Sequence, residues 1–282
     1  MSNRTFTAMA KDIDQGDYVL GTEDDEMRRL GLQNAVWRPR ATDAWRRAGF
    51  SAGQHILDIG CGPGYATFDL SDVVGPSGRI TGFERSPRFL EHLRHKLAAE
   101  PQRRVDLIDI DLDSTSFPSL TADGAWCRWV FSFVTRPREL LTRIREMLAP
   151  GSSLVIHEYF DYRTWRLIPR EPEFDGFVAA VMASWRANGG ETDIGMDLLP
   201  WLPDAGFKVA DARPLIDVAS PSDFVWQWPA AFVDTGVKRL LDLGFLTPDK
   251  ASLVTDAFRR ATANPDARLI TPGVLEIVAT AE

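Results

Sequence analysis

The sequence predicts an α/β fold built on a doubly wound, mostly parallel sheet of seven strands. Three observations predict it. Short apolar runs alternate with helical patterns from His55 onward, a glycine-rich turn joins the first run to a helix, and 282 residues are enough for one large domain. Because parallel strands need crossover connections, we expect helices on both faces of the sheet.

Each element has a local signal in the chain. Acidic residues follow Thr22, which can cap a helix, and Gly49 ends the run, so a helix is predicted between them. The predicted strands are short apolar runs: His55–Ile59, Arg79–Phe83, Val105–Asp109, Gly124–Arg128, Ser153–Tyr159, Phe207–Ile216 and Val274–Thr280. The predicted helices are Tyr65–Val74, Pro87–Ala99, Arg138–Leu148, Pro172–Asn188 and Met196–Ala205, and residues 221–263 are mainly helical.

Long excursions interrupt the later half of the strand pattern. Such excursions from a compact domain often form lids or binding elements. We therefore expect them to join the N-terminal segment in one cap. The expected segments are a helical cap segment (1–50), a core (51–160), a helical insertion (161–204), a sixth core strand (205–217), a second helical insertion (218–267) and a last core strand (268–282).

Composition and charge narrow the classes of partner. The net charge is −8 and the pI about 5.1, so no global field attracts nucleic acid or an anionic membrane. The two cysteines, Cys61 and Cys127, are not at metal-ligand spacing and are too few for a disulfide framework, which favours a reducing cytoplasm. No signal-peptide core or long apolar run predicts membrane insertion. We expect a cytoplasmic protein with a small-molecule partner, and either a monomer or a homodimer.

The strongest local signal is the segment ILDIGCGPGYATFDL at residues 56–70. An apolar strand runs into a glycine-rich turn that can approach a ligand closely, and a helix follows. A dinucleotide-binding turn would need a third glycine where Tyr65 stands, and no Lys-Ser/Thr pair closes the turn as a phosphate loop requires. The candidate ligand-binding residues of this turn are Asp58, Gly60, Cys61, Gly62 and Gly64.

The pattern D-x-G-x-G-x-G resembles the S-adenosylmethionine (SAM) binding motif of class I methyltransferases. The stretch MLAPGSSLVIHEY is similar to the family's later helix, Pro-Gly turn and fifth strand, and the resemblance covers about residues 50–160. It is closest to the small-molecule branch that includes quinone-biosynthesis enzymes. The resemblance implies a Rossmann-like fold, SAM as cofactor and S-adenosylhomocysteine (SAH) as product.

The resemblance also implies roles for residues after the next strands. Glu84 ends the second strand, where a carboxylate can accept hydrogen bonds from both ribose hydroxyls. An acidic residue after the third strand would bind adenine, and Asp109 and Asp113 remain alternatives to Asp111 for that role. The remaining expected cofactor contacts are Arg85 beside the ribose, Leu112 at the adenine and Arg128 at the methionine part.

Candidate catalytic and substrate residues follow from the fifth strand and from the aromatic residues. His157 and Tyr159 share one face of that strand and are the candidates for a general base, although a structural role for His157 is equally open. The expected substrate contacts are Tyr18, Trp129, Glu158 and Trp185. No asparagine completes the Asp–Asp–Asn set of metal-dependent relatives, so no metal is expected.

The resulting functional hypothesis is methyl transfer from SAM to a small, apolar or aromatic metabolite. The motif of enzymes that methylate nucleobase amines is missing, because Cys127-Arg128-Trp129-Val130 stands in its place. Two alternatives remain open. One is a methyltransferase that acts on RNA or protein, and the other is a SAM-binding relative without catalysis.

Overall fold

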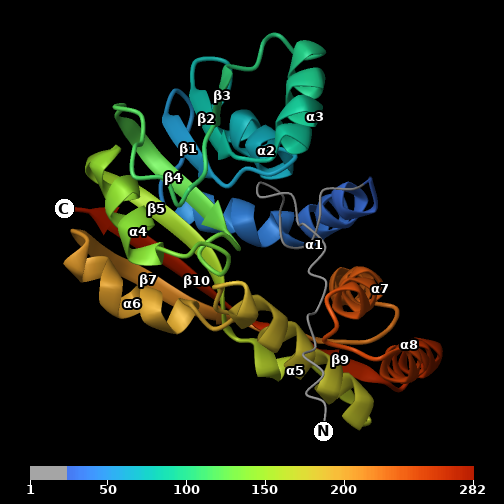
Figure 1. Cartoon of the computed structure of the whole chain (residues 1–282). Helices are drawn as coiled ribbons and strands as arrows, with labels where there is room; N and C mark the ends of the chain where they lie inside the picture. Colours follow the sequence, from blue (N-terminus) through green and yellow to red (C-terminus); the bar gives the residue numbers. More distant parts are fainter. Residues whose placement is uncertain (1–23) are drawn as a thin grey trace, which may run out of the picture.

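The computed structural model describes residues 24–282 (Figure 1), so the predicted substrate residue Tyr18 lies outside the described residues. At the centre lies a seven-stranded sheet with the order β3-β2-β1-β4-β5-β10-β7. Its strands are β1 (His55–Ile59), β2 (Arg79–Glu84), β3 (Val105–Asp109), β4 (Ala122–Arg128), β5 (Leu148–Asp161), β7 (Phe207–Leu215) and β10 (Gly273–Ala281).

The strand directions confirm the predicted fold class. Strands β3 to β5 pair in parallel, and β10 is antiparallel to both of its neighbours. Strand β1 lies between β2 and β4. The chain runs from β1 through β2 to β3 on one side and then returns past β1 to β4 on the other, so the strand order reverses at β1. In such sheets, ligands bind at this switch point, outside the carboxyl ends of the strands.

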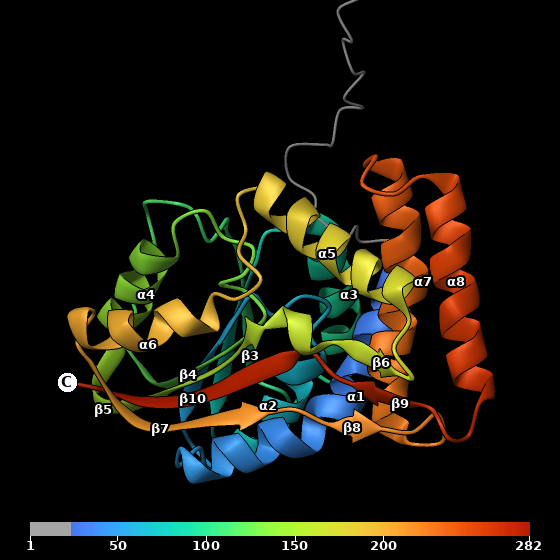
Figure 2. The same ribbon diagram turned by 90° about the horizontal axis from the view of Figure 1, so that it is seen from below.

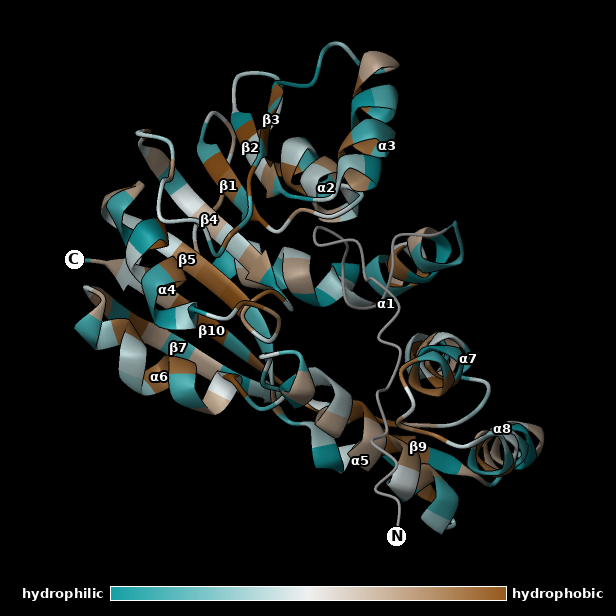
Figure 3. Cartoon of the chain, viewed as in Figure 1, coloured by the Kyte–Doolittle hydropathy of each residue, from teal (hydrophilic) through white to brown (hydrophobic). Residues whose placement is uncertain are grey.

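Helices cover both faces of the sheet, as the parallel pairing requires. The second half of α1 (Asp24–Arg47) and α2 (Tyr65–Val74) pack on one face, against side chains such as Ile56 and Trp126. Helices α4 (Pro137–Glu146) and α6 (Gly195–Asp204) pack on the other. Helix α3 (Pro87–Ala98) lies beside the edge strand β3. Figure 3 shows the hydrophobic central strands between these layers.

A second, smaller body of structure lies beyond one end of the sheet (Figure 2). Helices α5 (Pro172–Ala187), α7 (Gln227–Asp242) and α8 (Pro248–Ala263) pack together, and the first half of α1 contacts α7. A three-stranded sheet with the order β6-β9-β8 completes it, formed by Arg166–Ile168, Arg268–Ile270 and Val218–Ala219. These elements share one hydrophobic cluster that is rich in tryptophan and phenylalanine. We call this body the cap.

Two of the expected segment boundaries were wrong. Helix α6 was expected in the insertion 161–204, but it packs on β5, β7 and β10 and buries Leu198 and Leu202 against the central sheet. Residues 268–270 were expected to begin the last core strand, but they pair with β6 and β8 in the cap. Strands of two or three residues carry no readable period, so the small sheet was not predicted.

Candidate functional site

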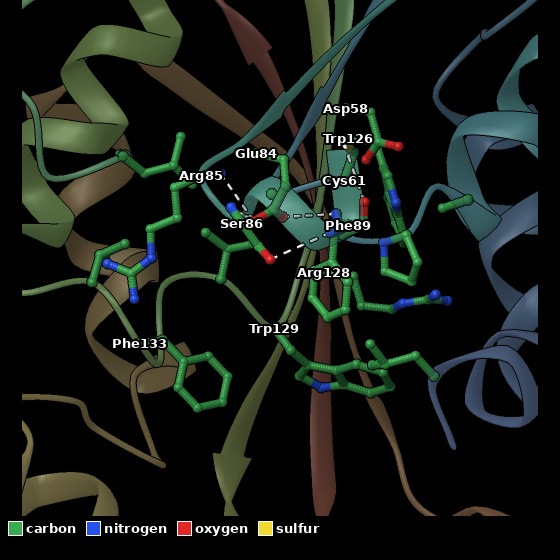
Figure 4. Close-up of a pocket in the computed structure, with 18 of the residues that line it drawn as sticks. Asp58, Cys61, Glu84, Arg85, Ser86, Phe89, Trp126, Arg128, Trp129 and Phe133 are labelled. Atoms are coloured by element: carbon green, nitrogen blue, oxygen red, sulfur yellow. Dashed lines mark hydrogen bonds between the residues drawn. The ribbon is translucent and has the colours of Figure 1, made fainter. Parts of the chain in front are cut away.

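A pocket lies at the carboxyl ends of four adjacent strands of the central sheet (Figure 4). Its walls come from the segments that follow β1, β2, β3 and β4, which end at Ile59, Glu84, Asp109 and Arg128. Helix α1 closes a further side with Leu30 and Gln33. The pocket therefore occupies the switch point of the parallel sheet.

The glycine-rich turn after β1 forms one wall and depends on left-handed backbone at two tightly packed positions. Gly60 has a φ of 69°, and a Cβ there would lie 2.4 Å from a methyl group of Val130. Gly64 has a φ of 86°, and its Cβ would lie 2.3 Å from Leu93. Larger residues would be strained and would clash, so glycine is required to keep the turn this close to its neighbours. Both Cys61 and Gly62 line the pocket.

Glu84 ends β2, and its carboxylate joins the glycine turn after β1 to the turn after β2 by hydrogen bonds. Its Oε2 accepts a hydrogen bond from Gly62 N at 2.9 Å, and its Oε1 accepts bonds from Arg85 N and Ser86 N at 2.9 and 2.7 Å. Burial raises the pKa of Glu84, while these three backbone donors oppose the rise. The carboxylate lines the pocket and still has lone pairs to accept bonds from a ligand.

Asp58 and Arg128 place opposite charges in the pocket from adjacent strands. Asp58 is buried, and its Oδ2 accepts a hydrogen bond from Thr67 Oγ1 at 2.7 Å. Burial raises the pKa of Asp58 to about 6, and the bond from Thr67 and the charge of Arg128 oppose this. Arg128 Nη2 donates to Asn34 at 2.8 Å, whereas Arg128 Nη1 is buried without a partner among residues 24–282. Burial lowers the pKa of Arg128 to about 10.

The segment after β3 forms the far wall of the pocket. Asp111 lines it, and Arg85 Nη1 lies 3.4 Å from Asp111 Oδ2. Of the alternatives, Asp113 also lines the pocket, but its carboxylate accepts bonds from the backbone of Thr135 and Arg136. Asp109 is exposed and not among the lining residues. The geometry therefore favours Asp111 for a contact with a ligand, and Leu112 lines the pocket beside it.

Comparison with known proteins identifies the domain that holds these residues. Residues 56–151 match the family described as "Methyltransferase domain". The match runs from β1 to the Pro-Gly turn of β5, and it contains the glycine turn and all four strand ends of the pocket. The resemblance to class I SAM-dependent methyltransferases is thus confirmed for the domain of residues 56–151.

Two similar curated proteins are both named as methyltransferases. A demethylmenaquinone methyltransferase of Symbiobacterium thermophilum is 30% identical over 149 residues, which are 50% of this chain and 59% of that protein. A trans-aconitate 2-methyltransferase of Methylobacterium nodulans is 28% identical over 57% of this chain and 61% of its own length. The chain thus spans about three fifths of these curated relatives.

A solved structure shows the same fold over more of the chain. The geranyl diphosphate C-methyltransferase of Streptomyces coelicolor A3(2), in a complex with SAH, has a TM-score of 0.56 at 14% identity. The comparison covers 87% of this chain and 76% of that one. At this identity the likeness shows the fold alone. No helix among residues 24–282 is long and apolar enough to cross a membrane.

The surroundings of His157 bear on whether it acts as a general base or has a structural role. The ring of His157 is fully buried between Trp37 and Trp126 and does not line the pocket. Its Nε2 lies 3.0 Å from Glu276 Oε2 on β10, a bond that joins two strands inside the sheet. Burial lowers the pKa of His157, and Glu276 opposes the shift. Of the two roles that the sequence left open, the geometry favours the structural one.

Three other predicted residues also lie behind the pocket wall. Glu158 is buried and accepts bonds from Val130 N, Phe131 N at 2.7 Å and Ser132 Oγ at 2.7 Å, so it shapes the loop after β4, and it is not among the residues that line the pocket. Tyr159 is stacked on Trp129, and burial raises the pKa of its hydroxyl, which disfavours loss of the proton. Trp185 belongs to the hydrophobic cluster of the cap. Of the predicted catalytic and substrate residues that lie within 24–282, only Trp129 lines the pocket.

Several lining residues were not predicted from the sequence. They come from α1, from the first turns of α2 and α3 and from the loop after β4, and they include Gln33, Tyr65, Phe89, Val130 and Phe133. One signal for Gln33 was available. Gln33 and Asn34 interrupt the run between Leu30 and Val36, where a purely structural helix would bury apolar side chains.

Proposed function

We propose that the protein transfers the methyl group of SAM to a small, apolar or aromatic metabolite, without a metal. The observation that carries the proposal is the pair of opposite charges at the ends of β1 and β4. The amino-acid part of SAM has one ammonium and one carboxylate. The buried carboxylate of Asp58 suits the ammonium, and the unpartnered Arg128 Nη1 suits the carboxylate.

The rest of the pocket fits the other parts of SAM. Glu84 is held by backbone donors with its carboxylate toward the pocket, where it would accept bonds from the ribose hydroxyls. Asp111 and Leu112 would meet the adenine, with Arg85 beside them. A Cβ at Gly62 would meet nothing within 4 Å, so the turn leaves open space on its pocket side. The residues present therefore fit the cofactor.

Bound SAM supplies an already activated methyl group, so the protein has to hold an acceptor in line with it and exclude water. No histidine is among the lining residues that the structure describes. We therefore propose that orientation, rather than a histidine base, accounts for most of the rate. The cap contributes apolar surroundings through aromatic rings such as Trp185, whose ring centroid lies 4.5 Å from that of Phe133 in the pocket wall.

The aromatic cap favours an apolar or aromatic acceptor, and among the relatives the name of the demethylmenaquinone enzyme agrees best with this. Nothing in the pocket favours RNA or protein as acceptor, and the net charge of −8 disfavours RNA. To test the proposal, we would incubate the protein and methyl-labelled SAM with a metabolite extract treated with a chelator. Label in a small organic molecule is expected. Label only in RNA or protein, or none at all, would contradict the proposal.

A second prediction concerns the dependence of SAM affinity on pH. The ammonium of SAM interacts best with ionised Asp58, whose pKa of about 6 is raised by burial. As pH falls through this value, Asp58 gains a proton and loses its attraction for the ligand. Affinity should be about tenfold weaker at pH 5 than at pH 7. Calorimetry at both values checks this.

The control for the pH prediction is Asp58→Asn, which keeps the shape of the side chain and cannot ionise. This variant should bind SAM more weakly at pH 7 and show much less change toward pH 5. Burial also raises the pKa of Glu84, so a small residual change is expected. If the variant retained the full pH dependence, Asp58 would not be the group whose protonation weakens SAM binding.

A further inference from the structure

Trp129 has an unusual backbone conformation for a large aromatic residue. It follows the last residue of β4 and has a φ of 51°, in the left-handed region that favours glycine. Backbone bonds hold it there: Trp129 N donates to His157 O at 2.9 Å, and the next two N–H groups donate to Glu158. Strain of this kind gathers at functional sites, where the surrounding structure enforces it.

The indole ring of Trp129 is clamped in one orientation. The rings of Tyr159 and Trp228 stack on it at centroid distances of 5.5 and 5.6 Å, both at 17°. Trp37 meets it edge-on at 5.2 Å. Trp228 is itself fixed, because its Nε1 donates to Gln33 Oε1 at 3.3 Å. A ring held by so many contacts presents its polar atom in a fixed direction.

That polar atom has no partner. Trp129 Nε1 is buried, and among residues 24–282 nothing accepts a hydrogen bond from it, whereas its stacked neighbour Trp228 has Gln33. Five buried indole N–H groups among residues 24–282 have no acceptor, those of Trp37, Trp45, Trp129, Trp165 and Trp226, and of these residues only Trp129 lines this pocket. Since a buried indole N–H usually finds an acceptor, an open one on a pocket residue points to a group that arrives with a ligand.

The position of Trp129 separates this donor from most of the cofactor contacts. Figure 4 shows Trp129 and Phe133 at one end of the pocket, with Asp58 and Glu84 at the other. Phe133 also lies 4.5 Å from Trp185 of the cap, so its ring stands between the pocket and the hydrophobic cluster of the cap. The surroundings of the open donor are therefore aromatic.

We propose that Trp129 Nε1 and the ring of Phe133 form the acceptor subsite, and that it selects an aromatic molecule whose hydroxyl or carbonyl oxygen accepts the bond from Trp129. This rests on the proposed methyl transfer and adds the class of acceptor. Because the donor is buried, Phe133 and the cap side chains must move aside as the acceptor enters. An apolar molecule of the same shape, without the oxygen, would leave the indole N–H unpaired and bind more weakly.

The test uses two probes of matched shape, 1-naphthol and 1-methylnaphthalene, with the full chain and saturating SAH. The indole N–H signals of ¹⁵N-labelled protein are followed by NMR, and the Trp129 signal is assigned by its loss in Trp129→Phe. We expect 1-naphthol to bind more tightly than 1-methylnaphthalene and to shift the Trp129 signal. Trp129→Phe should lower the affinity for 1-naphthol about threefold to tenfold and leave SAH affinity within about twofold.

A matched control is Trp226→Phe, which removes another buried, unpartnered indole N–H outside the lining of the pocket. It should change neither affinity. Equal binding of the two probes, binding of neither, or an equal effect of both substitutions would overturn the subsite. A large loss of SAH affinity in Trp129→Phe would also overturn it, because the donor would then serve the cofactor's carboxylate. Failure of the unaltered protein to bind SAH would instead contradict the proposed function itself.

Discussion

Replacing Glu84 with alanine is expected to weaken SAM binding on the order of 100-fold or more. The substitution removes the carboxylate that would accept two bonds from the ribose, each worth about 1.5–3 kcal/mol when one partner is charged. It also leaves Gly62 N, Arg85 N and Ser86 N without their shared acceptor. The turns after β1 and β2 are then no longer joined by hydrogen bonds at the pocket. Calorimetry of SAM binding measures the effect.

Two further variants make this result specific. Glu84→Gln keeps one acceptor oxygen without the charge, and its affinity should lie between those of the original protein and the alanine variant. Glu91→Ala removes an exposed carboxylate from the neighbouring helix α3 and should change nothing. Unchanged affinity in a folded Glu84→Ala protein would show that the ribose is held elsewhere.

Replacing Glu158 with alanine should destabilise the fold by about 3 kcal/mol or more. The side chain is fully buried and is the acceptor for Val130 N, Phe131 N and Ser132 Oγ. Each donor left unpaired in the interior costs about 1–3 kcal/mol, and the lost side-chain volume adds to this. Urea denaturation at pH 7 measures the free energy of unfolding.

The control variants for Glu158 separate hydrogen bonding from charge. Glu158→Gln keeps an oxygen for the two N–H groups and can donate to Ser132 Oγ, so it should recover most of the stability. Glu139→Ala breaks an exposed pair with Arg136 and should cost less than about 1 kcal/mol. If the alanine variant at position 158 were as stable as the Glu139 variant, the loop after β4 would not depend on Glu158.

The raised pKa of Glu158 makes the free energy of unfolding depend on pH, and the direction of this dependence follows from the shift. Burial raises the pKa to about 7, above the ordinary value of 4.5, although the bonds from Ser132 and the backbone oppose the rise. Between these values the folded protein binds more protons at this site than the unfolded chain does. The contribution of Glu158 to stability therefore falls as pH rises from about 4.5 to 7. The glutamine variant should lack this component.

The sequence predicted the central sheet well because its strands are continuous and apolar. The predicted bounds of β1 and β3 agree with the structure, and α2 begins and ends at the predicted residues. The glycine turn and Glu84, both predicted as cofactor contacts, line one pocket, where Glu84 accepts a hydrogen bond from Gly62 N. These features follow from local patterns, namely strand, turn and helix, that a sequence displays directly.

The surroundings of β5 could not be predicted in the same way. Strand alternation correctly put His157 and Tyr159 on one face and Glu158 on the other, but it does not say what covers each face. His157 is paired with Glu276, 119 residues away in the chain, through the antiparallel register of β10 with β5. Such a partner depends on the tertiary fold.

The cap was predicted as helical and as an assembly of the N-terminal segment with two insertions, but the way one helix is shared between cap and pocket was not predicted. Residues of α1 contact α7 and also line the pocket, because a single helix of 24 residues crosses from the sheet to the cap. Nothing in the local pattern of α1 indicates where one role ends and the other begins. The small sheet joins residues near 167, 218 and 269, a set of contacts that only the folded chain brings together.

The central claim is that the pocket binds SAM, and calorimetric titration of the unaltered protein with SAM and, separately, with NAD tests it most directly. Asp58, Arg128 and Glu84 match the ammonium, carboxylate and ribose of SAM, whereas Tyr65 occupies the position where a dinucleotide turn needs glycine. We expect saturable binding of one SAM per chain and no measurable heat from NAD. Binding of NAD without binding of SAM would contradict this account of the pocket.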